Sequence, residues 1–220
     1  MTILYLIRHS VKFERKCTNR LNCSDTNQLI DEKSILSVVG EKRAEILCNK
    51  EIFNDIDIIF SSNMVRSMQT AKYLCTRLNL PLNIDERINE RKMGIRNTNI
   101  DKDWYVKQYL EPKYKLKEGE SQEEVQKRMH SFISEIIKKY ENKNIAVFSH
   151  GYAITYALLK WCTLKNITKD RVLTYEFNNK IILDKIINAP EVFKLIFDKD
   201  KLVDIKLIEF EDLPFMNGGI

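Results

Sequence analysis

Short apolar runs that alternate with helical patterns are the feature that most limits the fold of this chain. The runs expected to form strands are Ile3–Ile7, Ile56–Phe60, Leu82–Ile84 and Ile145–Phe148. Between them, apolar residues recur three and four positions apart, which is typical of amphipathic helices. Strands that alternate with helices along a chain favour an α/β fold built around a parallel sheet.

The helical patterns have recognisable beginnings. The first covers Ser37–Lys50, and its first residue is a favourable N-cap. The second covers Met64–Leu78. The third begins at Ser121, which has the spacing of a capping box with Glu124. The fourth helix is expected at Gly151–Cys162, directly after the last of the four strands.

Two irregular segments and a terminal hairpin complete the predicted architecture. Lys12–Glu32 lacks periodicity and is expected to form a long loop, and residues 95–118 form an irregular insertion with a helix at about Lys102–Leu110. Alternating apolar and polar residues in Val192–Phe197 and Leu202–Phe210 predict a hairpin. We therefore expect a three-layer α/β/α sandwich with a mostly parallel central sheet and an antiparallel C-terminal edge.

Composition limits the class of protein. Residues 1–220 are expected to form one domain, in which 44% of residues are hydrophobic and 30% are charged. No apolar run approaches the roughly 20 residues of a membrane span, and the first residues lack the features of a signal peptide. The five cysteines are scattered, and Cys17 and Cys23 have no evident third ligand for a metal. These features predict a cytoplasmic protein without a metal or a membrane partner.

The net charge of +5 has two explanations. A modest positive field helps to attract an anionic substrate. A solvated surface rich in lysine and glutamate explains the same number more simply. The chain has no basic run interleaved with aromatic residues, which argues against a nucleic-acid partner. No sequence feature indicates an oligomeric state.

Histidine and arginine residues follow three of the predicted strands. The residues at these strand ends are Arg8-His9-Ser10, Ser61-Ser62 with Arg66 one helical turn later, and Ser149-His150-Gly151. The carboxyl ends of parallel strands face the crevice where such folds bind ligands. Two arginines can hold a phosphoryl group through several charge-assisted hydrogen bonds, and they favour a neutral, nucleophilic histidine. The sequence therefore predicts phosphate chemistry at one site.

The same motifs resemble those of the histidine phosphatase superfamily, also called the phosphoglycerate-mutase-like family. The matching residues are Leu6–Ser10 for R-H-G, Leu36–Gly40 with Ala44 for L-T-x-x-G…A, Asp57–Ser62 with Arg66, Thr70 and Ala71 for S-S-x-x-x-R-x-x-x-T-A, Ile88–Glu90 with Gly94 for the acidic segment, Gly119–Ser121 for G-E-S, and Ser149–Gly151 for S-H-G. Each motif alone is common. Together, in this order and at compatible spacing, they are a strong resemblance.

The resemblance implies a covalent mechanism without a metal or cofactor. His9 would be the nucleophile that takes the phosphoryl group on a ring nitrogen. Arg8, Arg66 and His150 would bind the phosphoryl oxygens and stabilise the transferring charge. Glu90 would protonate the leaving oxygen and then activate water against the phosphohistidine.

The residues around the phosphate include a departure from the family pattern. Ser10 stands where the family normally has glycine, so the turn either avoids positive φ or is strained, and the hydroxyl is a candidate phosphate contact. The family also places an asparagine nearby, for which Asn19 and Asn22 are the candidates. Ser62 and Gly151 are expected at the phosphate, although capping and turn geometry also account for them.

Two further assignments concern acidic residues and the third histidine. Asp85 and Glu86 lie near enough to Glu90 in the sequence to take its role instead. His130 lies off the apolar stripe of its helix and is expected to be a surface histidine without a role.

The expected function is that of a histidine acid-type phosphatase, a metal-independent phosphomonoesterase acting on a small-molecule phosphate ester. The alternative within enzymes is a phosphoglycerate-mutase-type phosphotransferase. Asn97–Glu118 is short and poorly matched to the longer insertions of the mutases, which favours the phosphatase. A third possibility is a weakly catalytic member that binds a phosphorylated ligand, for which Ser10 is the only indication.

Overall fold

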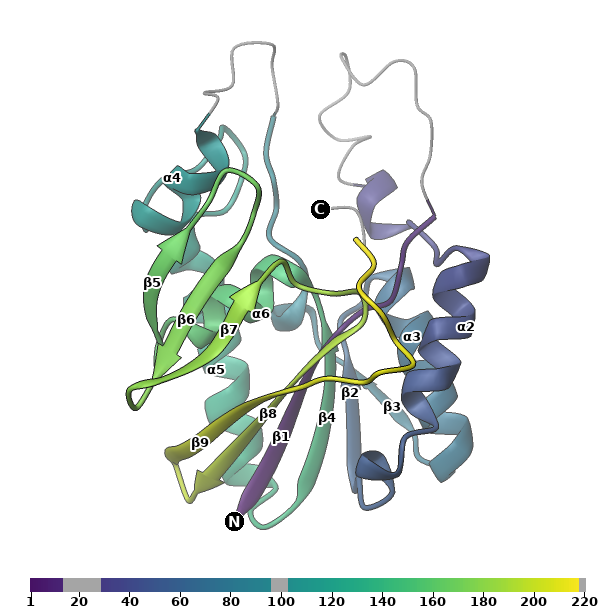
Figure 1. The fold of residues 1–220 in the computed structure, drawn as a ribbon. Coiled ribbons are helices and arrows are strands. Elements are labelled where there is room, and N and C mark those ends of the chain that lie inside the picture. The colour runs from purple at the N-terminus through teal and green to yellow at the C-terminus, as the bar shows by residue number, and fades with distance from the viewer. Residues whose placement is uncertain (14–28, 96–102, 218–220) are drawn as a thin grey trace.

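The computed structural model describes residues 1–13, 29–95 and 103–217. Its main sheet has six strands in the order β3-β2-β4-β1-β8-β9 (Figure 1). These strands are β1 (Thr2–Arg8), β2 (Ile58–Ser61), β3 (Leu82–Ile84), β4 (Asn144–Ser149), β8 (Glu191–Asp198) and β9 (Lys201–Ile208). The first four are parallel, whereas β8 is antiparallel to both β1 and β9. The predicted sheet, with its antiparallel C-terminal edge, is confirmed.

Helices cover both faces of this sheet (Figure 1). One face carries α2 (Val38–Cys48) and α3 (Val65–Leu78), and the other carries α5 (Gln122–Lys139) and α6 (Gly151–Leu158). Side chains of β1 alternate between the two cores, with Leu4 and Leu6 on the α5/α6 side and Tyr5 and Ile7 on the α2/α3 side. Both faces of the strand are buried, which explains its continuous apolar run.

The helices begin where side chains satisfy their first amide groups. The Ser37 hydroxyl accepts a hydrogen bond from the Gly40 amide at the start of α2. Ser121 and Glu124 form both hydrogen bonds of a capping box at the start of α5. Both N-caps predicted from the sequence are confirmed, because the capping pattern is local and needs no tertiary partner.

The register of the central strands sets the position of the candidate site. Arg8, the last residue of β1, pairs with Ser149, the last residue of β4. The next residues, His9 and His150, therefore leave the sheet side by side. Ser61 ends β2 beside the same strand β4. Three strand ends thus deliver their polar residues to one edge of the sheet.

A second, three-stranded sheet was not predicted from the sequence. It consists of β5 (Thr163–Ile167), β6 (Leu173–Phe177) and β7 (Lys180–Lys185) in antiparallel order. Its outer strands are largely exposed and lack a clear apolar alternation. The sheet joins the main core through buried side chains of β6 and β7, and the Tyr175 hydroxyl of β6 donates to the Thr155 carbonyl of α6.

The two irregular segments are described only in part. The helix expected in the insertion is confirmed as α4 (Trp104–Leu110), whose Tyr105 and Tyr109 rings pack against Tyr152 of α6. Residues 96–102 lie outside the described part of the chain. The predicted loop after Val11 is described only at its ends, and residues 29–32 form a helical turn.

The prediction that His130 lies on the surface is wrong. Its ring packs edge-on against the Trp161 ring, with the ring centroids 4.9 Å apart. Burial, and then the charge of Lys160, lowers the pKa of His130 to about 4. The residue lies off the main apolar stripe of α5, but α6 and the turn after it cover this side of the helix as well.

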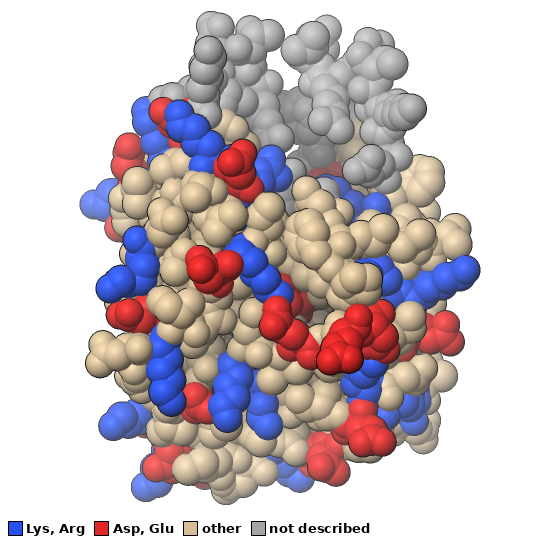
Figure 2. Space-filling view, in the orientation of Figure 1, with Lys and Arg blue, Asp and Glu red and all other residues tan. Residues whose placement is uncertain are grey.

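Charges of both signs are interspersed over the face of the molecule shown in Figure 2. This mixture fits a solvated surface better than one continuous basic field. Within the described residues, no helix has the length and apolar character needed to cross a membrane.

Candidate active site

The strand ends bring together the histidines and arginines that the sequence singled out. The His9 and His150 rings lie 5.0 Å apart between centroids and are tilted by 59°. Arg66 Nε lies 3.0 Å from His9 Nε2, and Ser62 Oγ lies 2.7 Å from His150 Nε2. All of these side chains, and Arg8 next to them, are buried. The structure therefore gathers the predicted cluster in one place.

Two hydrogen bonds define the protonation of His9. Its Nδ1 lies 2.6 Å from the Ser10 carbonyl oxygen, which can only accept, so Nδ1 carries the proton. Its Nε2 accepts from Arg66 Nε, so this nitrogen presents a lone pair. Burial, followed by the charges of Arg66 and Arg8, lowers the pKa of His9 well below its ordinary value. The ring is therefore neutral at physiological pH with Nε2 unprotonated.

The two arginines have different hydrogen-bond partners. Arg66, on the first turns of α3, donates from Nη1 to the Asp31 carbonyl and from Nη2 to the Asp31 carboxylate, at 2.6 and 3.4 Å. Arg8 Nη1 donates to the carbonyl oxygens of Ile187 and Asn188, at 2.7 and 3.0 Å. Burial lowers the pKa of Arg8 to about 10 despite the nearby carboxylates, so its guanidinium stays charged. The neutral carbonyl partners of Arg8 leave its positive charge available to an anion, whereas that of Arg66 is partly compensated by the Asp31 carboxylate.

His150 is the N-cap residue of α6, and Gly151 is the first residue of that helix. Burial, and then the charge of Arg66, keeps the pKa of His150 well below its ordinary value. Its Nδ1 is buried and makes no hydrogen bond to a described residue. This nitrogen is therefore available for a hydrogen bond to a ligand.

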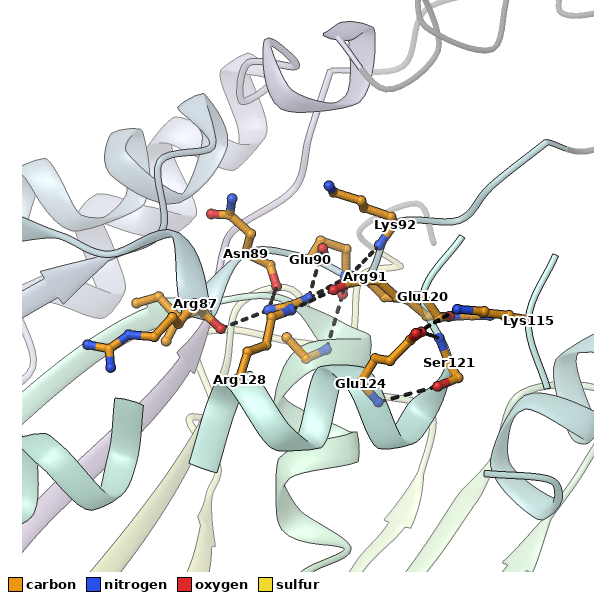
Figure 3. Close-up of polar contacts among 12 residues, drawn as sticks. Arg87, Asn89, Glu90, Arg91, Lys92, Lys115, Glu120, Ser121, Glu124 and Arg128 are labelled. Atoms are coloured by element: carbon orange, nitrogen blue, oxygen red, sulfur yellow. Dashed lines mark hydrogen bonds and ion pairs between the residues drawn. The ribbon is translucent and has the colours of Figure 1, made fainter. Parts of the chain in front are cut away.

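Glu90 lies in a segment without regular secondary structure, next to the start of α6. Its carboxylate accepts hydrogen bonds from the amides of Arg91, Ala153 and Tyr152, at 2.9, 3.1 and 3.4 Å (Figure 3). Two of the first amides of α6 are therefore bound to this carboxylate. Burial raises the pKa of Glu90 although these bonds and the Arg66 charge oppose it. A raised pKa keeps the protonated acid populated to higher pH.

A cavity of about 260 Å³ opens beside Glu90. Its lining is mostly charged and comprises Glu32, Met64, Glu86, Arg87, Asn89, Glu90, Lys92, Glu120 and Arg128. Acidic and basic residues are mixed in this lining, so the cavity is polar but does not have the uniformly positive lining of an anion-binding site.

Ser10 avoids the conformation that would make it strained. It is not among the described residues with positive φ, so the turn after His9 does not need a glycine. Its amide donates to Thr70 Oγ1 at 3.0 Å. Its hydroxyl oxygen is buried and makes no hydrogen bond to a described residue. Asn19 and Asn22 lie outside the described residues.

The sequence did not single out Lys12 as part of the site. Burial lowers the pKa of Lys12, and the main opposing charge is Asp31. The positive charge of Lys12 in turn adds to the lowering of the pKa of His9, after the larger effects of burial and the two arginines. Lys12 thus adds a third cation close to His9. Its position three residues after His9 is the only signal that the sequence offers.

The described residues contain no group of three or more histidine, cysteine, aspartate or glutamate side chains placed to hold a metal ion. Cys48, Cys75 and Cys162 are free thiols, while Cys17 and Cys23 lie outside the described residues. In the described site, positive charge is supplied by arginine and lysine.

Comparison with known proteins defines the family. A sequence model of the histidine phosphatase superfamily (branch 1) matches residues 4–178, and the chain belongs to this superfamily. It is 27% identical over 154 residues to "Putative phosphoserine phosphatase 2" of Hydrogenobacter thermophilus, covering 66% of this chain and 74% of that protein. It is 26% identical over 162 residues to "Probable phosphoglycerate mutase GpmB" of Yersinia pestis, covering 70% and 72%.

Solved structures share the fold at lower sequence identity. YhfR of Bacillus stearothermophilus superposes with a TM-score of 0.66 at 18% identity, covering 92% of this chain and 95% of that one. A mutant phosphoserine phosphatase from Entamoeba histolytica, in complex with phosphoserine, gives a TM-score of 0.62 at 19% identity, covering 97% and 98%. These similarities show a common fold.

Proposed function

We propose that this protein is a metal-independent phosphomonoesterase that works through a phosphohistidine. The observation that carries the proposal is the state of His9, whose Nε2 lone pair lies beside Arg66 while Nδ1 is protonated. A phosphate ester bound by Arg8, Arg66 and His150 would present its phosphorus to this nitrogen. Ser10, Ser62 and Gly151 are proposed as further phosphate neighbours.

The proposed reaction has two steps. In the first, His9 Nε2 forms a bond to phosphorus, the ester P–O bond breaks, and the Glu90 carboxylic acid gives its proton to the leaving oxygen. In the second, the Glu90 carboxylate takes a proton from water, the water oxygen bonds to phosphorus, and the N–P bond breaks. Inorganic phosphate leaves, and His9 and Glu90 return to their starting states.

Glu90 is a better candidate for the acid than its neighbour Asp85. Burial alone would raise the pKa of Asp85, but hydrogen bonds from Arg87 outweigh it and lower that pKa. Asp85 is therefore ionised, and its carboxylate forms an ion pair with Arg87. The pKa of Glu90 is raised, and its carboxylate lies beside a cavity that has room for a leaving group. The surroundings of Glu90 therefore suit a proton donor better than those of Asp85 do.

Phosphatase activity is favoured over mutase activity by the short middle segment and by the phosphatases among the relatives. The relative named as a phosphoglycerate mutase supports the alternative, in which an organic acceptor replaces water. The substrate is proposed to be a small phosphate ester, and the scattered cysteines favour a reducing, cytoplasmic setting.

The test is release of p-nitrophenol from p-nitrophenyl phosphate in excess chelator, by the wild type and by His9→Ala. We expect turnover that survives chelation and falls by at least about 1000-fold in the variant, because the nucleophile is lost. Turnover that persists in His9→Ala would contradict the assignment of His9. Tight vanadate binding without turnover in the folded wild type would favour the mutase or the ligand-binding alternative.

A further inference from the structure

The segment that carries Glu90 has little secondary structure to hold it. A short 3-10 helix, η2 (Glu86–Ile88), ends just before Glu90, and residues 89–95 belong to no helix or strand. Carbonyl groups in such a segment need partners from elsewhere in the molecule. The source of these partners determines where the Glu90 carboxylate can lie.

Arg128 of α5 supplies most of these partners (Figure 3). Its Nη1 donates to the carbonyl oxygens of Arg87 and Asn89, both at 2.8 Å, and its Nη2 donates to that of Glu90 at 3.2 Å. Nε and Nη2 also donate to the two carboxylate oxygens of Glu120, each at 2.9 Å. All five N–H groups of the guanidinium are thus engaged.

Glu120 extends the same network to the other side of Glu90. Its carbonyl oxygen accepts from Arg91 Nε at 2.7 Å, and its carboxylate accepts from the Lys92 amide at 2.9 Å. Its own amide donates to the Lys92 carbonyl at 2.9 Å. The segment from residue 87 to residue 92 is therefore held on both sides of Glu90, by Arg128 of α5 and by Glu120, which precedes the N-cap of that helix.

The Arg128–Glu120 pair does not belong to the phosphate-binding cluster. Its charges balance each other, and Arg128 has no N–H group left for a phosphoryl oxygen. Both side chains are about four-fifths buried, so the pair is shielded from solvent and its geometry is restricted. An ion pair with restricted geometry of this kind can hold a neighbouring segment in a fixed position.

We propose that Arg128, together with Glu120, is the positioning residue for Glu90, and that it places this carboxyl group within reach of the leaving oxygen. The inference rests on the proposed function, in which Glu90 is the acid. Displacement of a proton donor by about 1 Å costs on the order of 100-fold in rate. Lysine at position 128 would keep the charge but could not reproduce five donors in a planar fork.

The test compares esters whose leaving groups differ in their need for a proton. Release of the leaving group is measured in a single turnover, with enzyme in excess, for p-nitrophenyl phosphate and phenyl phosphate. Phenolate is the more basic leaving group, so it depends more on the acid. We expect Arg128→Lys to slow release from phenyl phosphate by about 10- to 100-fold, and from p-nitrophenyl phosphate by less than about 3-fold.

Two variants serve as references. Glu90→Gln should show the same dependence on the leaving group, with a larger loss. Arg77→Lys is the matched control, because it makes the same substitution on another helix, where the guanidinium of Arg77 in α3 donates to the Asn54 side chain and the Lys50 carbonyl and does not line the cavity beside Glu90. It should retain wild-type rates for both esters. Vanadate affinity should stay unchanged in Arg128→Lys and in the control variant, since the phosphate-binding side chains are intact.

The outcomes separate this inference from the function on which it rests. Equal slowing of both esters, or no slowing, in folded Arg128→Lys would overturn the positioning role while a selective loss in Glu90→Gln leaves the proposed function standing. No selective loss in Glu90→Gln would remove both the acid role and its positioning residue. If Arg128→Lys fails to fold, Glu120→Gln carries the same test, with a selective loss expected for phenyl phosphate.

Discussion

At the scale of single residues, the site combines a neutral histidine with buried cations. His9 keeps its proton on Nδ1 through the Ser10 carbonyl and presents Nε2 to Arg66. Arg8 is bound to two carbonyl groups, and Arg66 is bound to one carbonyl group and, at 3.4 Å, to the Asp31 carboxylate, so their positive charges are only partly compensated. Buried positive charge lowers the pKa of a neighbouring histidine and raises the affinity of the site for an anion. Both consequences favour attack on a phosphate ester.

The proposed acid makes a prediction about pH. Glu90 must be protonated in the first step, so kcat/KM should fall as pH rises through its raised pKa. The pKa of His9 is lowered, so the rise in kcat/KM that reports its deprotonation should lie below the usual histidine range. In Glu90→Gln this falling limb should be absent, so the ratio of variant to wild-type kcat/KM, in which ionisation of the substrate cancels, should rise with pH through the pKa of Glu90. An unchanged falling limb in the variant would contradict the acid role.

At the scale of elements, α2 packs directly on the turn after His9. The Ser37 amide donates to the Val11 carbonyl at 3.0 Å, and the Ser37 hydroxyl donates to the same oxygen at 3.2 Å. A Cβ atom at Gly40 would lie only 2.0 Å from this oxygen. Glycine is therefore needed here for close approach of the helix to the backbone, and the contact links α2 to the position of His9.

Gly40→Ala should damage both stability and activity. We expect the free energy of unfolding to fall by about 1–3 kcal/mol, because the backbone must shift to admit the methyl group. The value of kcat/KM should fall as well, since Val11 is two residues from His9. Val39→Ala, a change at an exposed position of the same helix, should stay within about 0.5 kcal/mol of wild type. Denaturant unfolding and p-nitrophenyl phosphate turnover measure the two effects, and equal stability of both variants would contradict the packing argument.

At the scale of the whole molecule, the N-terminal strand depends on the C-terminal part of the chain. Arg8 is held by the carbonyl groups of residues 187–188, which lie outside the region matched to the family. Asn188 is held in turn by the Leu213 carbonyl and the Met216 amide. Arg43 of α2 also donates to the Pro214 carbonyl. The orientation of Arg8 therefore depends on contacts that are made near the end of the described chain.

Removing residues 213–220 should lower both the stability of the protein and the affinity of the site for vanadate. Loss of the buried Leu213 side chain alone should lower the free energy of unfolding by about 2–4 kcal/mol. Loss of the carbonyl and amide partners of Asn188 should also raise the Kd for vanadate, measured by competition against turnover. Leu213→Ala is the control, because it removes the side chain but keeps the main-chain partners, and it should retain the vanadate affinity. Unchanged affinity in the truncated protein would contradict the coupling.

The sequence by itself determined the alternation of strands and helices, the helix caps, and the residues at the three strand ends. These features are predictable because periodicity and capping are local, and because parallel strands present their carboxyl ends at one edge. Only the tertiary structure decided what holds the arginines, since Arg8 contacts a carbonyl group 179 residues away along the chain. It also decided the burial of His130, the second sheet, and the role of Arg128 around Glu90. Every residue has a main-chain carbonyl group, so the residue types in a sequence do not indicate which carbonyl groups will accept from an arginine.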